Sequence, residues 1–357
     1  MNRFWSHVTR KLTPYVPGEQ PRVPQLVKLN TNEHPLTASS AVLEAIALTS
    51  AEALRRYPDP ESMALRQAIA AVENLQVDQV FVGNGSDEVL AHIFAALLCS
   101  REAINTLDVT YSFYPVWSTL YGVQCNLVPL SESMAVDISA LCATEGPILL
   151  PNPNAPTGIA MSYGDIEQLV KSNTDRLVVV DEAYYGFGAD TAVGLVGQYD
   201  NLLITRSLSK SHALAGLRVG YALGHVALIE GLTRVKDSFN SYPLDALAQA
   251  GSTAAIRDLN WLRAASQVVI DNRSYLTTSL EKLGFSVCPS AANFVFAQHA
   301  SVAGHTIFEH LRSHNILVRR WEKARINNHL RITVGTKDQC EALVKCLSEY
   351  LGGLDQS

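Results

Sequence analysis

Short apolar runs alternate with longer amphipathic segments through the middle of the chain. Seven runs have the length and composition of strands, at residues 79–82, 103–107, 123–128, 147–150, 177–180, 202–205 and 219–223. Apolar positions spaced three and four residues apart predict helices over residues 86–99, 112–121, 163–172 and 225–237. The uninterrupted apolar run at 177–180 is typical of a strand buried on both faces. We therefore predict an α/β fold whose mostly parallel sheet is covered by helices on both faces.

The two ends of the chain have a different pattern. Residues 13–40 are rich in Pro, Thr, Ser and Asn, which predicts extended or looped chain. Helices are expected over 41–53, 61–74, much of 241–282 and 336–351. Short strands are predicted at 285–288, 293–297, 316–320 and 329–334, around a helix near 301–313. We expect a large domain over residues 41–282 and a smaller α+β domain built from residues 1–40 and 283–357.

Composition and charge exclude several classes of protein. The chain has 357 residues, of which 47% are hydrophobic and 17% charged, enough for a large core. Its 28 basic and 34 acidic residues give a net charge of −6, which argues against a nucleic-acid partner or an anionic membrane surface. No apolar run is long enough to span a membrane. The six cysteines form no C-x-x-C pair, which argues against a disulfide framework and favours a reducing cytoplasm.

The ten histidines show no clear metal-ligand spacing. His310 and His314 lie four residues apart on a predicted helix, but the sequence indicates no third ligand near them. A solvated helix face explains this pair, so no metal site is expected.

Polar residues that follow four of the predicted strands are the candidate site, because ligands of open α/β sheets bind beyond the carboxyl ends of the strands. A glycine-containing turn leads to Ser86 and Asp87 at a helix start, where backbone N–H groups can bind phosphate. Asp181 ends the buried strand at 177–180 and needs a partner there. Lys210 follows the strand at 202–205 among serines, and Arg218 comes eight residues later. A rigid Pro- and Asn-rich loop follows the strand at 147–150.

Each of these signals alone has a plainer explanation, such as a capped turn, a paired acid or a surface lysine. Together they supply a phosphate cradle, a carboxylate and an amine nucleophile at one edge of the sheet. That set is what pyridoxal 5′-phosphate requires, namely a Schiff-base lysine, an acid at the pyridinium nitrogen and a phosphate anchor.

The motifs themselves resemble those of a known family. Asn-Pro-Asn-Ala-Pro-Thr-Gly at 152–158, Asp-Glu-Ala-Tyr at 181–184, and Ser-Leu-Ser-Lys at 207–210 with Gly-Leu-Arg at 216–218 are similar to fold-type I pyridoxal-phosphate aminotransferases. Supporting segments occur in family order at residues 28–33, 56–60, 83–88, 293–295, 316–319 and 330–335. The first two favour the histidinol-phosphate aminotransferase branch. The resemblance implies transamination of L-histidinol phosphate with 2-oxoglutarate in histidine biosynthesis. An aromatic amino acid aminotransferase and a threonine-phosphate decarboxylase, which share the scaffold, remain open alternatives.

The resemblance also implies roles for single residues of the cofactor site in the large domain. Lys210 carries the Schiff base and moves the proton, while Asp181 pairs with the protonated ring nitrogen. Tyr184 and Asn154 contact the phenolic oxygen of the cofactor, and Tyr111 stacks on its ring. The phosphate is expected to be held by Ser86, Asp87, Ser207, Ser209 and Arg218.

Substrate and subunit contacts follow from the same resemblance. Arg331 binds the carboxylate of glutamate or 2-oxoglutarate and, with Arg319, the phosphate of histidinol phosphate. Tyr57 reaches the cofactor phosphate of a neighbouring subunit, which implies a homodimer. The sequence departs from the family at Ala155, where asparagine is usual, and at His34, in a segment that commonly carries a tyrosine near the substrate.

Overall fold

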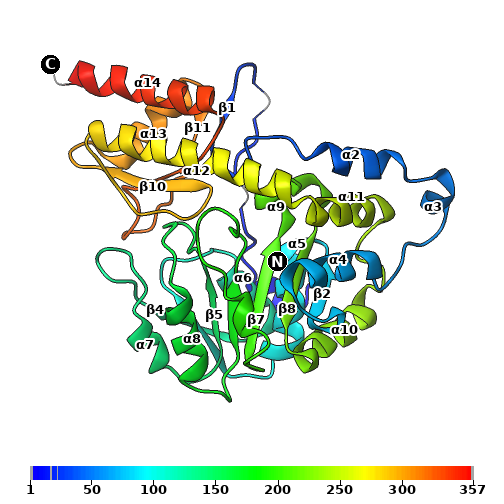
Figure 1. The fold of residues 1–357 in the computed structure, drawn as a ribbon. Helices are drawn as coiled ribbons and strands as arrows, with labels where there is room; N and C mark the ends of the chain where they lie inside the picture. Colours follow the sequence, from blue (N-terminus) through cyan, green and yellow to red (C-terminus); the bar gives the residue numbers. More distant parts are fainter. Residues whose placement is uncertain (1–2, 17, 22, 355–357) are drawn as a thin grey trace.

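The central sheet contains all seven predicted strands, in the order β2-β8-β7-β6-β5-β3-β4 (Figure 1). The computed structural model describes residues 3–16, 18–21 and 23–354. The strands are β2 (Val80–Gly83), β8 (Gly220–Gly224), β7 (Leu202–Ser207), β6 (Val178–Asp181), β5 (Ile148–Pro151), β3 (Ala103–Leu107) and β4 (Gln124–Val128). β8 runs antiparallel to its neighbours β2 and β7, whereas β5, β6 and β7 are parallel. Their register places Pro151, Asp181 and Thr205 side by side at the carboxyl edge of the sheet.

Helices cover both faces of this sheet because alternate strand residues point to opposite sides. Val178 and Val180 belong to one hydrophobic cluster and Val179 to another. The first cluster includes side chains of α2 (Ser40–Ala47), α4 (Met63–Glu73), α7 (Ile138–Cys142), α8 (Tyr163–Lys171) and α11 (Ala246–Arg257). The second includes α5 (Gly85–Ile93) with its π-helical extension Phe94–Leu98, α6 (Tyr114–Tyr121) and α10 (Val226–Phe239). The predicted doubly covered α/β sheet is confirmed.

A smaller antiparallel sheet, in the order β12-β10-β9, forms from the C-terminal strands. Its elements and the helices around it are α12 (Leu259–Lys282), β9 (Phe285–Val287), β10 (Phe294–His299), α13 (Gly304–Ser313), β12 (Leu330–Thr333) and α14 (Lys337–Leu354). α12 packs both on α9 (Leu208–Ser211), beside the large sheet, and on β9 and β10. Among the helices of the described residues, none combines the length and apolarity that a membrane crossing needs.

The N-terminal segment contains two short elements that the sequence did not specify, a helix before residues 13–40 and a strand within that extended or looped stretch. Residues His7–Lys11 form α1, and Val27–Lys28 form β1, which pairs in parallel with β11 (Ile316–Leu317). Leu29 then packs among the apolar residues of the C-terminal sheet and helices. The predicted helix at 41–53 is also two helices, α2 and α3 (Ala51–Arg55), because Ser50 between them caps α3 through its hydroxyl, 3.1 Å from the Ala53 nitrogen.

Two glycines let β8 approach the start of α5. A Cβ atom added at Gly220 would lie 2.3 Å from the Ser86 nitrogen, so only glycine fits this contact. Gly85 has φ +84°, a left-handed conformation that favours glycine, and a Cβ there would lie 2.6 Å from Arg218 Nη2. The two positions therefore bring the first N–H groups of α5 close to Arg218.

Replacing Gly220 by alanine should destabilise the protein by about 1–3 kcal/mol, because a Cβ pressed on backbone cannot be relieved by rotating a side chain. Gly216→Ala is the matched control, since a Cβ at Gly216 meets no atom within 4 Å. Chemical denaturation of both variants measures the difference. Equal stability of the two variants would contradict the close contact between β8 and α5.

Candidate active site

A cavity of about 250 Å³ opens at the carboxyl edge of the large sheet. Its walls come from the N-terminal segment, the start of α5, the ends of β6 and β7, and the C-terminal strands. It brings together most of the residues singled out in the sequence: Ser86, Asp87, Tyr111, Asp181, Tyr184, Ser207, Ser209, Lys210, Arg218, Arg319 and Arg331.

Lys210 is the amine of this cavity. It lies in α9, directly after β7, and its Nζ donates a hydrogen bond to the Thr31 carbonyl oxygen at 3.0 Å. Burial lowers its pKa to about 8, and the nearby Arg331 cation adds to that effect, against the charges of Glu33 and Asp87. A lysine with this pKa is partly uncharged near neutral pH, and only the uncharged amine is a nucleophile or a base.

Asp181 is a carboxylate surrounded by neutral donors. Tyr114 donates to its Oδ2 at 3.0 Å, while Thr205 Oγ1 and the Ala183 nitrogen donate to Oδ1 at 3.0 and 3.1 Å. Its side chain is almost fully buried, and burial raises its pKa to about 6 in spite of these hydrogen bonds. Among the residues that the structure describes, no cation forms a salt bridge with it.

A cluster of donors lies where β7, α9 and α5 meet. Arg218 reaches Ser209 Oγ at 3.4 Å and the Asp87 carboxylate at 3.3 Å, so its guanidinium is held beside the first turn of α5. Ser207 and Ser209 hydroxyls face the same cavity as Ser86. A helix N-terminus combined with hydroxyls and a guanidinium is a strong anion site.

Tyr184 and Tyr111 form aromatic parts of the wall. The Tyr184 hydroxyl accepts a hydrogen bond from Asn32 Nδ2 at 2.9 Å. Burial raises the Tyr184 pKa, while Arg331 and the Asn32 bond act in the opposite direction. The Tyr111 hydroxyl donates to Asp87 Oδ1 at 3.2 Å, and its ring meets Tyr114 edge-on.

Two arginines stand together at the wall formed by the C-terminal part. Residues Arg319 and Arg331 form an antiparallel backbone bridge, which brings both side chains to the cavity. Arg331 donates to the Asn30 carbonyl oxygen at 2.8 Å, but its Nε is buried without a partner. Burial and the neighbouring Arg319 lower the Arg331 pKa. A bound anion would accept a hydrogen bond from Arg331 Nε and would offset the two adjacent positive charges of Arg319 and Arg331.

Three residues predicted for the site do not line the cavity. Asn154 donates its amide N–H groups to the Val109 carbonyl, in the segment after β3, at 3.0 Å and to Thr157 Oγ1 of its own loop at 3.1 Å, while the neighbouring Ala155 faces the cavity. His34 accepts a hydrogen bond from the Leu36 nitrogen at 3.0 Å, and burial lowers its pKa to about 4. Tyr57 is 82% exposed and stacks on Tyr242, so this chain alone does not bring it to the site.

Sequence reasoning overlooked several residues that shape the site. Tyr114 and Thr205 are donors to Asp181, and Asn32 orients Tyr184. Tyr15, in the segment interpreted as loop, also lines the cavity and packs on Phe113 with ring centroids 5.0 Å apart. Strand register could have indicated Thr205, since it lies beside Asp181, but no local pattern marks Tyr15.

These residues fit pyridoxal 5′-phosphate, which carries a phosphate, an aldehyde and a basic ring nitrogen. The Arg218 cluster suits the phosphate, and the Lys210 amine suits the aldehyde. Asp181 accepts hydrogen bonds from neutral donors only, so a protonated pyridine nitrogen would supply the positive charge that a buried carboxylate needs.

This chain is similar in sequence and in fold to known proteins. A family model for aminotransferase class I and II matches residues 24–347. The chain is 54% identical over 351 residues to a histidinol-phosphate aminotransferase of Gluconacetobacter diazotrophicus, covering 98% of this chain and 99% of that protein. It is 53% identical over 347 residues to histidinol-phosphate aminotransferase 2 of Thiobacillus denitrificans, covering 97% of each. The crystal structure of the Sinorhizobium meliloti histidinol-phosphate aminotransferase in complex with pyridoxal-5′-phosphate has the same fold, with a TM-score of 0.87, 23% identity and 99% coverage of both chains.

The low pKa of Lys210 can be measured by competitive acylation of the cofactor-free protein, followed by peptide mass spectrometry. We expect the Lys210 rate to reach half its maximum near pH 8, because burial and Arg331 favour the neutral amine. Lys345, with an exposed side chain, serves as the internal standard for reagent decay. Arg331→Met removes a neighbouring cation and should move the midpoint to higher pH. A midpoint near the ordinary lysine value of about 10.4 would contradict the desolvated site.

Proposed function

We propose that this chain, which belongs to the class I and II aminotransferase family, transfers the amino group of L-histidinol phosphate to 2-oxoglutarate in histidine biosynthesis. Pyridoxal 5′-phosphate is the cofactor of this aminotransferase. The proposal is supported by identity above 50%, over nearly the full length, to proteins of that name. The observation that carries it is the pair of guanidiniums, Arg319 and Arg331, on the cavity wall with Lys210.

Lys210 and Asp181 carry the chemistry of the proposal. The bound cofactor supplies an electron sink for the pair of electrons left when the substrate loses its α-proton. Lys210 Nζ, with a pKa near 8, accepts and returns that proton at neutral pH. Asp181, fixed by Tyr114 and Thr205, keeps a proton on the ring nitrogen by offsetting its positive charge.

The remaining residues bind and orient. The Arg218 cluster and the start of α5 hold the cofactor phosphate, and Tyr184, oriented by Asn32, contacts the phenolic oxygen. Arg331 binds the carboxylate of 2-oxoglutarate, and the two arginines together bind the phosphate of histidinol phosphate. A planar guanidinium can pair with either anion through the same donors, so one pocket can serve two substrates in turn.

The roles of Asn154 and His34 are revised in this proposal. The Ala155 side chain, which faces the cavity, offers no hydrogen bond, and the Asn154 amide N–H groups donate to Val109 and Thr157. Contact with the phenolic oxygen therefore falls to Tyr184. His34 lies 5.8 Å from Trp261 between ring centroids and supports the wall by packing.

We further propose that the active protein is a homodimer in which Tyr57 reaches the cofactor phosphate of the partner subunit. Tyr57 and its stacking neighbour Tyr242 are both exposed in the single chain, as a surface that meets a second copy would be.

The large cofactor-binding domain is proposed to span residues 41–282, with residues 1–40 and 283–357 as the small domain. A separate hydrophobic cluster, which joins Leu29 to residues beyond 283, supports this division, although Leu276 and Leu280 of α12 also pack into it. A cytoplasmic location is proposed because all six cysteines are free.

Steady-state assays with histidinol phosphate, phenylalanine and threonine phosphate test the substrate. We expect kcat/KM to be highest for histidinol phosphate, and Arg319→Met to lower that value by about ten- to hundred-fold through loss of a charged hydrogen bond. The half-reaction with 2-oxoglutarate should change far less. Arg234→Met, at an exposed arginine of α10, is the control. Turnover of phenylalanine or threonine phosphate alone would refute the proposed substrate.

Mixing two inactive variants tests the shared site. Lys210→Ala and Tyr57→Ala should each abolish or strongly reduce activity as pure proteins. If Tyr57 serves the partner subunit, a mixed dimer contains one site with both residues intact, so activity returns after subunit exchange. No recovery, with mixed dimers verified by mass spectrometry, would place Tyr57 in its own subunit's site or outside the site.

A further inference from the structure

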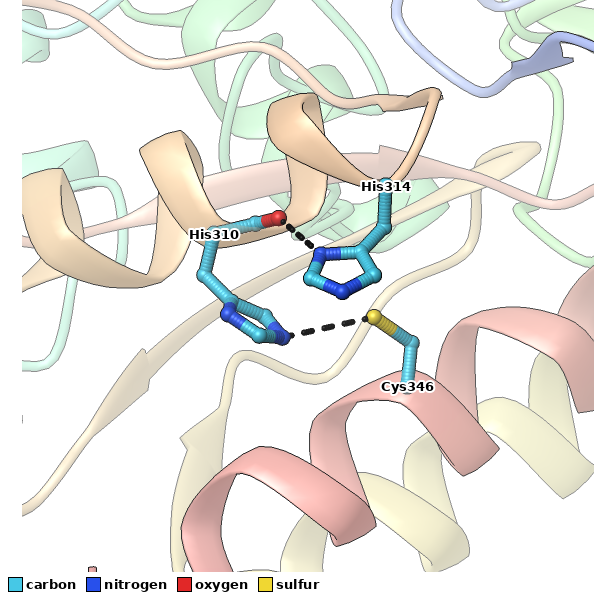
Figure 2. A group of neighbouring side chains, drawn as sticks. All are labelled: His310, His314 and Cys346. Carbon is cyan, nitrogen blue, oxygen red and sulfur yellow. Dashed lines mark hydrogen bonds between the residues drawn. The ribbon is translucent and has the colours of Figure 1, made fainter.

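Cys346 of α14 lies beside His310 and His314 at the end of α13 (Figure 2). The Cys346 sulfur is 3.5 Å from His310 Nε2, and ligand atoms of all three residues lie within 4.8 Å of one another. The sequence indicated no third ligand beside this histidine pair, and the structure places Cys346 there from another helix. None of the three residues lines the active-site cavity.

The hydrogen bonds at His314 leave one ring nitrogen free for a metal. His314 Nδ1 lies 2.8 Å from the His310 carbonyl oxygen, and a carbonyl only accepts, so Nδ1 carries the hydrogen. The neutral ring then keeps its lone pair on Nε2, and Figure 2 shows this nitrogen turned toward Cys346. Metal-binding histidines commonly donate their other N–H to a backbone carbonyl, which fixes the ring in the same way.

The separation of the Cys346 and His310 ligand atoms matches a tetrahedral zinc site. Zn–S and Zn–N bonds of about 2.3 and 2.05 Å at a tetrahedral angle separate the sulfur and nitrogen by about 3.6 Å. The observed separation of Cys346 Sγ and His310 Nε2 is 3.5 Å. His314 is exposed, so rotation of its side chain can complete the set without disturbing the core.

The surroundings favour a cation at this place. His310 lies in the last turn of α13 and His314 is its C-cap, where the helix dipole is negative. The His310 ring stacks on Tyr350 with centroids 4.0 Å apart, which fixes its orientation before any ion binds.

We propose that His310, His314 and Cys346 bind one Zn²⁺ ion, with water as the fourth ligand. Binding forms three Zn–ligand bonds and releases one proton from the Cys346 thiol to solvent, with no change of oxidation state. The ion joins α13 to α14 and stabilises the C-terminal part of the fold. This site lies outside the cavity, so it is independent of the proposed transamination.

Zinc binding can be measured on the holoenzyme after dialysis against a chelator, by equilibrium dialysis with ZnSO₄ and elemental analysis. We expect one zinc per chain and a melting temperature raised by about 2 °C or more. His310→Ala, His314→Ala and Cys346→Ser should each weaken binding by at least about ten-fold. Co²⁺ should give the visible bands of a tetrahedral site with a thiolate ligand, and Cys346→Ser should lose the thiolate band.

Matched controls separate this site from casual surface binding. His305→Ala, at an exposed histidine of the same helix, and Cys99→Ser, at an exposed cysteine, should bind zinc as the wild type does. His314→Ala should fold normally because its side chain is exposed, so the test survives if His310→Ala does not fold. Substoichiometric zinc, wild-type affinity in any of the three ligand variants, or equal loss in a control variant would overturn the proposal.

Discussion

The buried carboxylate of Asp181 is the constraint on which the rest of the site depends. A charge at the end of a fully buried strand is costly unless it is paired, and the described chain offers it neutral donors only, from Tyr114, Thr205 and the Ala183 backbone. These donors fix the direction of the carboxylate without cancelling its charge. In the proposed function a cationic ring nitrogen is the partner of this carboxylate, and its charge would offset the cost of burying the acid.

Lys210 is the basic counterpart of Asp181 in the same cavity. Burial and the Arg331 cation lower the pKa of its amine, whereas burial raises the pKa of Asp181, so the same cavity holds a partly neutral base and an acid whose charge needs a partner. Titratable groups pushed in different directions within one pocket are typical of acid–base catalysis. Arg331 lowers the Lys210 pKa, and in the proposed function the same cation attracts anionic substrates.

Elements and motifs followed from the sequence more directly than side-chain directions did. All seven strands of the large sheet lie where apolar runs predicted them, and all except the edge strand β4 are almost wholly buried, which leaves a plain signal in the sequence. β1 was not predicted because a strand of two residues shows no periodicity. Its partner β11 lies near the other end of the chain, so no local pattern indicates the pairing. The roles of Asn154 and His34 were predicted from motifs alone, but the hydrogen bond from Asn154 to Val109 and the burial of His34 depend on tertiary structure. The approach of Cys346 to His310 and His314 also depends on tertiary structure, because it results from the packing of two separate helices.

The protonation state of the cofactor ring nitrogen tests the central claim most directly. It can be observed by nuclear magnetic resonance of holoenzyme reconstituted with ¹⁵N-labelled pyridoxal 5′-phosphate. In the wild type the nitrogen should stay protonated from about pH 6 to 9, because the adjacent carboxylate stabilises the cation. In Asp181→Ala it should lose its proton within that range. An unprotonated nitrogen in the wild type, or the same shift in both proteins, would contradict the pairing of Asp181 with the cofactor.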